Sequence, residues 1–248
     1  MLNAEASFLP HLHSLHARFP KLRIVLEHAT SAAAVEAVKQ CGPTVGCTIT
    51  PHHLALTVDA WAGQPLNFCK PVAKHASDRE ALRRVIAEGN PKFFLGSDSA
   101  PHTLRKKLPS AHDHVHALAN RSRSSGGQGQ EQEQEQGGAG SECPSCAAGI
   151  YSSSELVPLV AELFEDASYG TQIPLERLNG FVSAFGRRFY QEPVRAGEKS
   201  LRLRRGSGRR LPQGYSFVAE DGEQEYVRPF YAGRTVRWEI VGGAETTE

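Results

Sequence analysis

Residues 92–102, KFFLGSDSAPH, constrain the fold more than any other stretch of this chain. The apolar run at residues 93–95 predicts a short buried strand, which Gly96 and Ser97 end. Asp98 then stands at the carboxyl end of the strand, the end that faces the active site in a parallel α/β barrel. A carboxylate in that place can bind a metal ion or transfer a proton. The alternative is an aspartate that caps the next helix, a common role at strand–helix junctions.

The chain ahead of this stretch alternates between strand-like and helix-like segments. Branched apolar residues predict three further strands, the last of them weakened by its proline, at residues 22–26, 45–50 and 66–72. Periodicity and capping residues predict helices at residues 4–18, 31–40 and 78–88. This order is typical of a parallel sheet with helical crossovers, so we expect an α/β fold with four parallel strands.

A histidine supplies the second candidate ligand. His28 follows the predicted strand at 22–26, and therefore stands at the same edge of the sheet as Asp98. A neutral imidazole at a strand end suits zinc; the alternative is a hydrogen-bonded core histidine. Three other histidines lie in the predicted helix 4–18, where residues two apart point in different directions, and we interpret them as solvated. They are His11, His13 and His16.

Composition narrows the classes of function. The chain has 248 residues, of which 40% are hydrophobic, with a mean hydropathy of −0.39 and a net charge of +1. This balance indicates neither nucleic acid nor a membrane as a partner, and no apolar run is long enough to cross a bilayer. The first residues lack the order of a signal peptide. Five cysteines without a repeated spacing argue against a disulfide framework, so we expect a cytoplasmic protein.

Residues 104–142 differ from the rest of the chain. They are polar, rich in Gly, Gln and Glu, and low in complexity, which predicts a disordered insertion. Just beyond it, Cys143 and Cys146 have the spacing of half a zinc site, but there is no second pair. We interpret the alternating histidines within the insertion as an incidental polar run: His112, His114 and His116.

Order is predicted to resume after the insertion. We expect residues 143–194 to add C-terminal helices to the domain formed by residues 1–103. Alternating runs in residues 195–248 predict a small β appendage folded back on that domain. Its basic stretch, LRLRRGSGRR, is interpreted as a solvated strand face because its arginines alternate and acids lie nearby.

Five motifs occur in one order along the chain: LEHATS, TITPHHL, NFCKPVAK, FLGSDSAPH and CAAGIY. Together they resemble consecutive motifs of the dihydroorotases, in the short monofunctional branch found in bacteria and fungi. The resemblance implies the C-terminal half, strands five to eight, of a (β/α)8 TIM barrel of the amidohydrolase type with two zinc ions. It also implies the reversible hydrolysis of dihydroorotate to N-carbamoyl-L-aspartate in pyrimidine biosynthesis.

The same resemblance implies roles for two metal ligands. His28 would ligate the more buried zinc ion. Asp98 would ligate the other ion, deprotonate the bridging water, and hand the proton to the leaving ring nitrogen. This is metal-assisted hydrolysis.

The resemblance also implies a set of substrate-binding residues. His102 and the backbone of Ala147 would bind the substrate carboxylate, and the backbone at Lys70 would hold the ring amide. Ala100 lies with His102 on the loop that would cover the site.

The chain departs from the family pattern in what it lacks. The family's first strand ends in His-x-His, followed by an Arg and an Asn for the substrate, a carbamylated lysine and a further histidine ligand. None of these has a counterpart here. Two protein ligands cannot hold a pair of zinc ions, so we expect the isolated chain to be inactive. Four strands would also leave open edges that allow pairing with a second copy, as in a homodimer.

Two alternatives stay open. One is a non-catalytic barrel remnant that binds a partner or a full-length homologue through its open edge. The other is a different metal-dependent cyclic-amide hydrolase, such as a hydantoinase-like enzyme. The motifs FLGSDSAPH and CAAGIY disfavour the latter, because a carboxylate-binding His102 suits an acidic ring.

Overall fold

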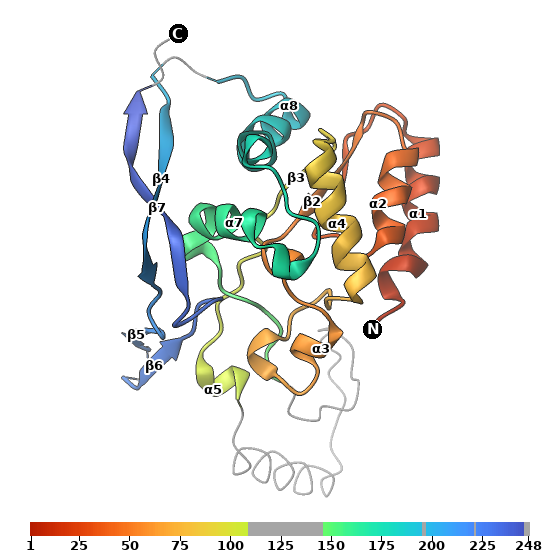
Figure 1. Ribbon diagram of the computed structural model, residues 1–248. Coiled ribbons are helices and arrows are strands. Elements are labelled where there is room, and N and C mark those ends of the chain that lie inside the picture. Colours follow the sequence, from red (N-terminus) through yellow and green to blue (C-terminus); the bar gives the residue numbers. More distant parts are fainter. Residues whose placement is uncertain (109–145, 195–196, 221, 246–248) are drawn as a thin grey trace, which may run out of the picture.

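A three-stranded parallel sheet, in the order β1, β2, β3, lies at the centre of the computed structural model (Figure 1). The structure describes residues 1–108, 146–194, 197–220 and 222–245. The strands are β1 Ile24–Leu26, β2 Val45–Ile49 and β3 Phe93–Leu95. Every residue of β2 is buried, as is typical of a central strand covered on both faces. The mixed α/β class that we predicted is confirmed.

The prediction of a strand at residues 66–72 was wrong. A 3₁₀ turn, η2 Pro65–Asn67, leads there into an irregular loop. Pro71 has no N–H to give to a strand ladder. The carbonyl of Phe68 accepts a hydrogen bond from Lys107 Nζ at 2.8 Å, so other loops satisfy this backbone in place of a neighbouring strand.

Three helices cover one side of the sheet and lie next to one another (Figure 1). They are α1 Ala4–Arg18, α2 Ala32–Gln40 and α4 Ala76–Glu88. Their ends follow from local chemistry. Ser31 caps α2 by accepting the Ala34 N–H at 3.1 Å, and Gly89 ends α4 in a left-handed conformation with a φ of 74°.

The histidines of α1 only partly match their predicted solvation. His11 is exposed. His16 Nε2 accepts the Gly42 N–H at 2.9 Å, and His13 Nδ1 lies 3.7 Å from the Cys41 thiol. These two rings therefore hold α1 against the end of α2.

Short helices connect the sheet to the rest of the chain. After β2 come η1 His52–Leu54 and α3 Val58–Trp61; after β3 comes α5 Leu104–Lys107. Ordered structure thus continues past residue 104, where we expected the insertion to begin, and Lys107 is buried. The alternating histidines and Cys143 lie outside the described residues.

The helices beyond residue 146 pack near the sheet. The longest is α7 Leu156–Glu165, which buries a wide apolar stripe that includes Leu159, Leu163 and Phe164. Around it are η3 Ser153–Glu155, η4 Ala167–Tyr169, η5 Leu175–Arg177, the π-helical turn η6 Gly180–Ala184 and α8 Phe185–Tyr190.

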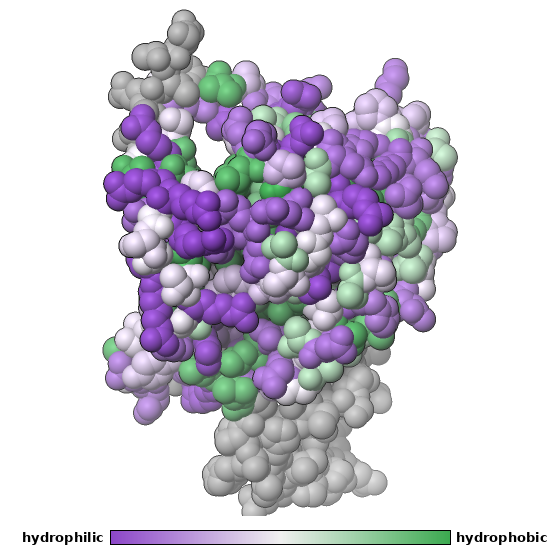
Figure 2. Space-filling model, in the orientation of Figure 1, coloured by the Kyte–Doolittle hydropathy of each residue, from purple (hydrophilic) through white to green (hydrophobic). Residues whose placement is uncertain are grey.

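Antiparallel strands occupy the C-terminal segment, where we predicted a small β appendage. A long antiparallel ribbon pairs β4 Lys199–Arg210 with β7 Thr235–Glu245, and a hairpin pairs β5 Tyr215–Val218 with β6 Gln224–Val227. The ribbon runs along the side of the molecule opposite α1 (Figure 1). Figure 2 shows a mostly hydrophilic face on which hydrophobic residues form separate patches. None of the described helices has both the length and the apolar character that crossing a bilayer requires.

Candidate active site

The ends of the two outer strands carry the residues predicted to bind metal. Glu27 and His28 come directly after β1, and Asp98 follows β3. Because β1 and β3 are parallel strands of one sheet, both ends lie at the same edge. His28 and Asp98 both have left-handed backbones, with φ of 44° and 39°. Such conformations are uncommon in residues other than glycine, and they cluster at functional sites.

The strand between them, β2, shapes the turn after β1. The His28 N–H donates to Thr48 Oγ1 at 2.7 Å, and the Ala29 N–H donates to the Thr48 carbonyl at 3.0 Å. The Thr48 hydroxyl in turn donates to the Glu27 carboxylate. A Cβ on Gly96 would come within 2.7 Å of Thr48 Cβ, so β3 also packs closely on this side chain. Thr48 therefore fixes the turn on which His28 sits.

Asp98 is coupled electrostatically to both residues at the end of β1. Partial burial raises the pKa of Asp98, the His28 imidazole lowers this pKa, and the Glu27 carboxylate raises it. The net shift is upward from the ordinary value. A carboxyl group with a raised pKa is better matched to proton transfer than an ordinary aspartate.

The same two residues fit part of a zinc centre. His28 Nδ1 is buried and has no hydrogen-bond partner, so this ring is not a hydrogen-bonded core histidine. Asp98 does not cap the following helix, because the N-cap of α5 is Thr103. An imidazole nitrogen and a carboxylate oxygen both suit zinc, although zinc sites use three or four protein ligands. The two residues therefore fit the metal as an incomplete set.

Loops from distant parts of the chain bring together three of the residues predicted to bind substrate. Ala100 and His102 follow β3, whereas Ala147 comes from beyond the insertion. The Ala100 N–H donates to the Ile150 carbonyl at 3.0 Å. His102 Nε2 lies 3.0 Å from the Ala148 carbonyl oxygen. These bonds join the loop after β3 to the CAAGIY segment.

A buried lysine, Lys107, fastens these loops. Its Nζ donates to the carbonyls of Phe68, Ala147 and Gly149 at 2.8, 2.9 and 3.0 Å. Burial lowers the pKa of this ammonium group, and the Lys107 residue as a whole is only 4% exposed. The Ala147 N–H donates to the Lys106 carbonyl at 2.9 Å, so it is already engaged and would have to leave that partner to bind a carboxylate.

Lys70, the fourth predicted substrate residue, lies two positions after Phe68 in the loop that Lys107 fastens. Its side chain is exposed, and its peptide bond to Pro71 is cis. Lys107 therefore fixes the loop at Phe68, two residues before Lys70.

A cavity of about 430 Å³ adjoins the same loops. Ala100 and His102 line one part of it, and Tyr151 and Tyr231 line another. The metal-ligand candidates at the ends of β1 and β3 do not line it. The predicted site thus has two parts, a sheet edge with ligand-type side chains and a cavity bounded by His102.

Several residues that shape this region were missed by sequence reasoning. Lys107 stood in a stretch predicted to be disordered, and nothing in the local pattern marks it as buried. Thr48 was read only as part of a strand. A third omission is a buried group of ligand-type side chains inside the TITPHHL and NFCKPVAK motifs, where the motifs themselves were the available signal: His52, His53 and Cys69.

Known proteins that resemble this chain over nearly its whole length include dihydroorotases. No family model matches the chain. Dihydroorotase from Mycosarcoma maydis is 49% identical over 97% of this chain and 62% of its own length. The crystal structure of dihydroorotase from Saccharomyces cerevisiae in complex with 5-fluoroorotic acid has a TM-score of 0.72 at 35% identity, over 97% of this chain and 57% of that one.

A more distant solved structure agrees in fold alone. It is the L-hydantoinase (dihydropyrimidinase) from Arthrobacter aurescens, with a TM-score of 0.66 at 16% identity over 96% of this chain and 46% of its own. The chain spans 62% or less of the length of these relatives. The dihydroorotases nevertheless match nearly all of it, in sequence and in structure. Nearly the whole of this chain is thus similar, in sequence and in structure, to one part of the dihydroorotases.

Proposed function

We propose that this chain supplies one part of a dihydroorotase active site. In it, His28 and Asp98 bind zinc, and the loops around His102 hold the substrate ring. The observation that carries the proposal is the meeting of His28 and Asp98 at one sheet edge, with a buried His28 nitrogen that lacks a partner. The relative crystallised with 5-fluoroorotic acid supports a cyclic acid as the substrate class.

The chemistry assigned to Asp98 is proton transfer during amide hydrolysis. Zinc, when bound, would supply hydroxide near neutral pH and polarise the amide carbonyl. The water oxygen bonds to the carbonyl carbon while Asp98 accepts the water proton. Asp98 returns this proton to the ring nitrogen as the carbon–nitrogen bond breaks, which yields N-carbamoyl-L-aspartate. The raised pKa of Asp98 supports this role, and ring closure follows the same steps in reverse.

Substrate binding is assigned to the loops that Lys107 fastens. The His102 imidazole and the backbone of Ala147 would bind the carboxylate, and the backbone at Lys70 would hold the ring amide. The Ala147 N–H now donates to Lys106, so this assignment requires the CAAGIY segment to shift when the carboxylate binds.

The three-stranded sheet is proposed to be part of an eight-stranded barrel. Parallel order, helical crossovers and likeness to amidohydrolase structures support this. Among the described residues, no strand pairs with the outer edge of β1 or of β3, so the sheet can be continued beside β1. Just beyond the end of β3, Ser99 forms a single parallel bridge with Ile150. Two ligands cannot hold two zinc ions, and the isolated chain is therefore proposed to be inactive.

The test is an assay of the purified 248-residue chain in both reaction directions, with zinc added. We expect no turnover above the blank. Turnover that depends on Asp98 would overturn the proposed incompleteness while supporting the reaction. Turnover that survives both His28→Ala and Asp98→Asn would overturn the assignment of the site.

The open sheet edges favour one second candidate, a non-catalytic chain that pairs with a full-length homologue or with its own copy. Gel filtration of the chain, alone and mixed with the Mycosarcoma maydis dihydroorotase, tests this candidate. A stable complex whose turnover is unchanged by His28→Ala would favour the binding role. Elution as a monomer in both runs would exclude it.

A further inference from the structure

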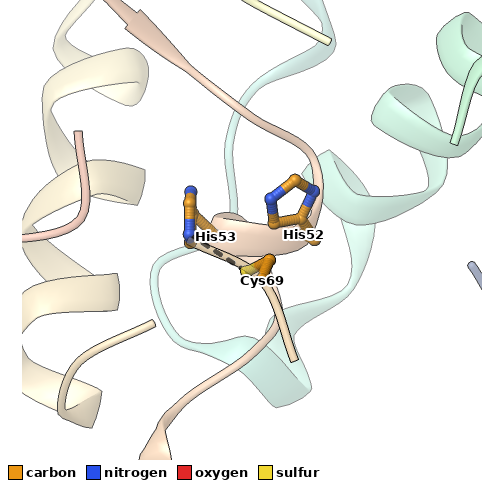
Figure 3. Close-up of side chains that lie close together, drawn as sticks. All are labelled: His52, His53 and Cys69. Atoms are coloured by element: carbon orange, nitrogen blue, oxygen red, sulfur yellow. Dashed lines mark hydrogen bonds between the residues drawn. The ribbon is translucent and has the colours of Figure 1, made fainter. Parts of the chain in front are cut away.

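A second group of ligand-type side chains lies beside the proposed site and takes no part in it. His52 and His53 form the start of η1, directly after β2, and Cys69 comes from the loop after η2 (Figure 3). One ring nitrogen of each histidine and the cysteine sulfur lie within 4.8 Å of one another. The three residues are 0%, 2% and 3% exposed. Two separate segments thus converge on one buried point.

His52 is the member that packing alone does not explain. Neither of its ring nitrogens has a hydrogen-bond partner, although the ring is wholly buried. Phe230 lies edge-on to it with ring centroids 6.4 Å apart, and offers no acceptor for an N–H. Buried polar groups in native proteins are nearly always paired. An ion is one partner that would satisfy an imidazole nitrogen in so confined a place.

His53 and Cys69 already face a common point (Figure 3). His53 Nε2 lies 3.8 Å from Cys69 Sγ, and both atoms lie near the Pro71 carbonyl oxygen, at 3.1 and 3.4 Å. In a tetrahedral zinc site, a nitrogen and a sulfur ligand are separated by roughly 3.6 Å. The pair therefore needs little movement to bind one ion.

Thr50 holds His53 in the orientation of a ligand. His53 Nδ1 lies 2.7 Å from Thr50 Oγ1. A metal-binding histidine usually engages its second nitrogen in this way, which fixes the tautomer and the ring angle. With the proton moved to Nδ1 and donated to Thr50, Nε2 would exchange its contact with the Pro71 carbonyl for the ion.

We propose that His52, His53 and Cys69 form a buried binding site for one zinc ion, separate from the pair that the family implies. Two imidazoles and one thiolate are a common ligand set for zinc. The fourth position would be taken by water or by the Pro71 carbonyl. Binding releases one proton, from the Cys69 thiol, and the complex carries a net charge of +1.

The surroundings of Cys69 hold this proton more firmly than an ordinary cysteine does. Burial raises the pKa of Cys69 to about 12, and Asp98 adds to the rise, whereas Lys107 and Lys74 oppose it. The ion must therefore compete with a proton that burial holds firmly. Because all three ligands are buried, exchange with a chelator in solution is expected to be slow.

The ion would tie η1 to the loop that contains Lys70. The position of Lys70 matters for the ring amide only if the proposed function holds, whereas the metal site itself does not depend on that function. The role is structural: the bound ion would fasten the Phe68–Pro71 loop, whose Phe68 carbonyl already accepts a hydrogen bond from Lys107.

Cobalt(II) is the probe for this site. The 248-residue chain, stripped of metal under reducing conditions, is titrated with cobalt and followed in the near ultraviolet. We expect a thiolate-to-cobalt charge-transfer band that saturates at one equivalent and is displaced by zinc. Cys69→Ser removes the band. Cys47→Ser, at a buried cysteine in β2 bonded to the Thr48 carbonyl, retains it, as does the double variant C143S/C146S.

Two further variants keep the test independent of folding failure. His52→Gln removes a ligand without removing a hydrogen bond, and is expected to weaken zinc binding at least about tenfold with unchanged circular dichroism. Thr50→Val is expected to weaken it by about 10- to 100-fold. His28→Ala and Asp98→Asn should leave the cobalt band in place. Absence of the band, its survival in Cys69→Ser, or its loss in His28→Ala would overturn the proposal.

Discussion

The two β regions of this molecule are stabilised in different ways. The parallel sheet is buried, including all of β2 and both phenylalanines of β3. The β4–β7 ribbon lies at the surface and is joined to α7 by charged side chains, as where Arg237 Nε donates to Glu162 at 2.9 Å. Full burial of one large apolar side chain contributes about 1.5–3 kcal/mol, whereas an exposed ion pair contributes about 0–1 kcal/mol. The region that carries the proposed site is therefore the more rigid one.

The largest expected loss of stability is at Arg83, whose guanidinium joins α4 to η1 and α7. Its guanidinium is fully buried and donates to four backbone carbonyls, among them Leu163 at 2.9 Å and Leu54 at 3.3 Å. Arg83→Leu leaves these carbonyls unpaired, so the free energy of unfolding should fall by about 3–5 kcal/mol in urea denaturation. The matched control is Arg84→Leu at the exposed neighbour, which should change it by less than about 0.5 kcal/mol. Equal effects of the two substitutions would contradict the distinction between buried and surface charge.

The next effect concerns the loops of the site. Lys107→Met removes three charged hydrogen bonds from buried carbonyls, and we expect a loss of about 2–4 kcal/mol. Hydrogen exchange should show faster opening of residues 66–70 and 147–150. Lys106→Met, one position earlier, is the control and should leave both measurements almost unchanged. Unchanged exchange in Lys107→Met would mean that the loops are held in another way.

A smaller effect is expected in the ribbon. Arg204 pairs with Glu239 at 2.8 Å, and the two side chains are 67% and 37% exposed. Arg204→Ala should lower the free energy of unfolding by less than about 1 kcal/mol, and by less still at high salt. A loss as large as that of Arg83→Leu would show that the ribbon is part of the core.

The smallest change in stability is expected at Asp98, which lies at the edge of the buried sheet. This change sharpens the comparison with the surface ribbon. Its pKa is raised above the ordinary 3.8 in the folded state, so folding favours the protonated form. The stability that Asp98 contributes is present below pH 3.8 and is lost as the pH rises through the raised pKa. Asp98→Asn should therefore stabilise the chain at pH 7, with a difference that vanishes in acid. If Asp98→Asn instead destabilised the chain at pH 7, the ionised Asp98 carboxylate would not lower the free energy of unfolding, which would contradict this account.

What the sequence predicted correctly was local chemistry. Ser31 and Gly89 end their helices through contacts within a few residues, and the runs at β1, β2 and β3 are apolar in themselves. The strand predicted at residues 66–72 failed because the backbone there bonds to loops far away in the chain. Lys107 was missed for the same reason, since its three acceptors belong to distant segments.

In the candidate site, too, local features could be predicted and contacts between distant segments could not. His28 and Asp98 could be placed at one edge because parallel strands share that edge, whatever the rest of the chain does. The partners that shape the edge could not be predicted, because the hydroxyl of Thr48 is indistinguishable in sequence from that of any other strand threonine. Cys69 approaches His53 only through the path of an irregular loop, which no periodicity indicates.

The most direct measurement is turnover by a fusion of this chain to the unmatched part of the Mycosarcoma maydis dihydroorotase. We predict hydrolysis of dihydroorotate by the fusion, reduced by about two orders of magnitude or more in His28→Ala and in Asp98→Asn. His11→Ala, at an exposed histidine of α1, is the control and should retain full turnover. An active fusion whose turnover survives both substitutions would contradict the assignment of His28 and Asp98 as ligands of the metal centre.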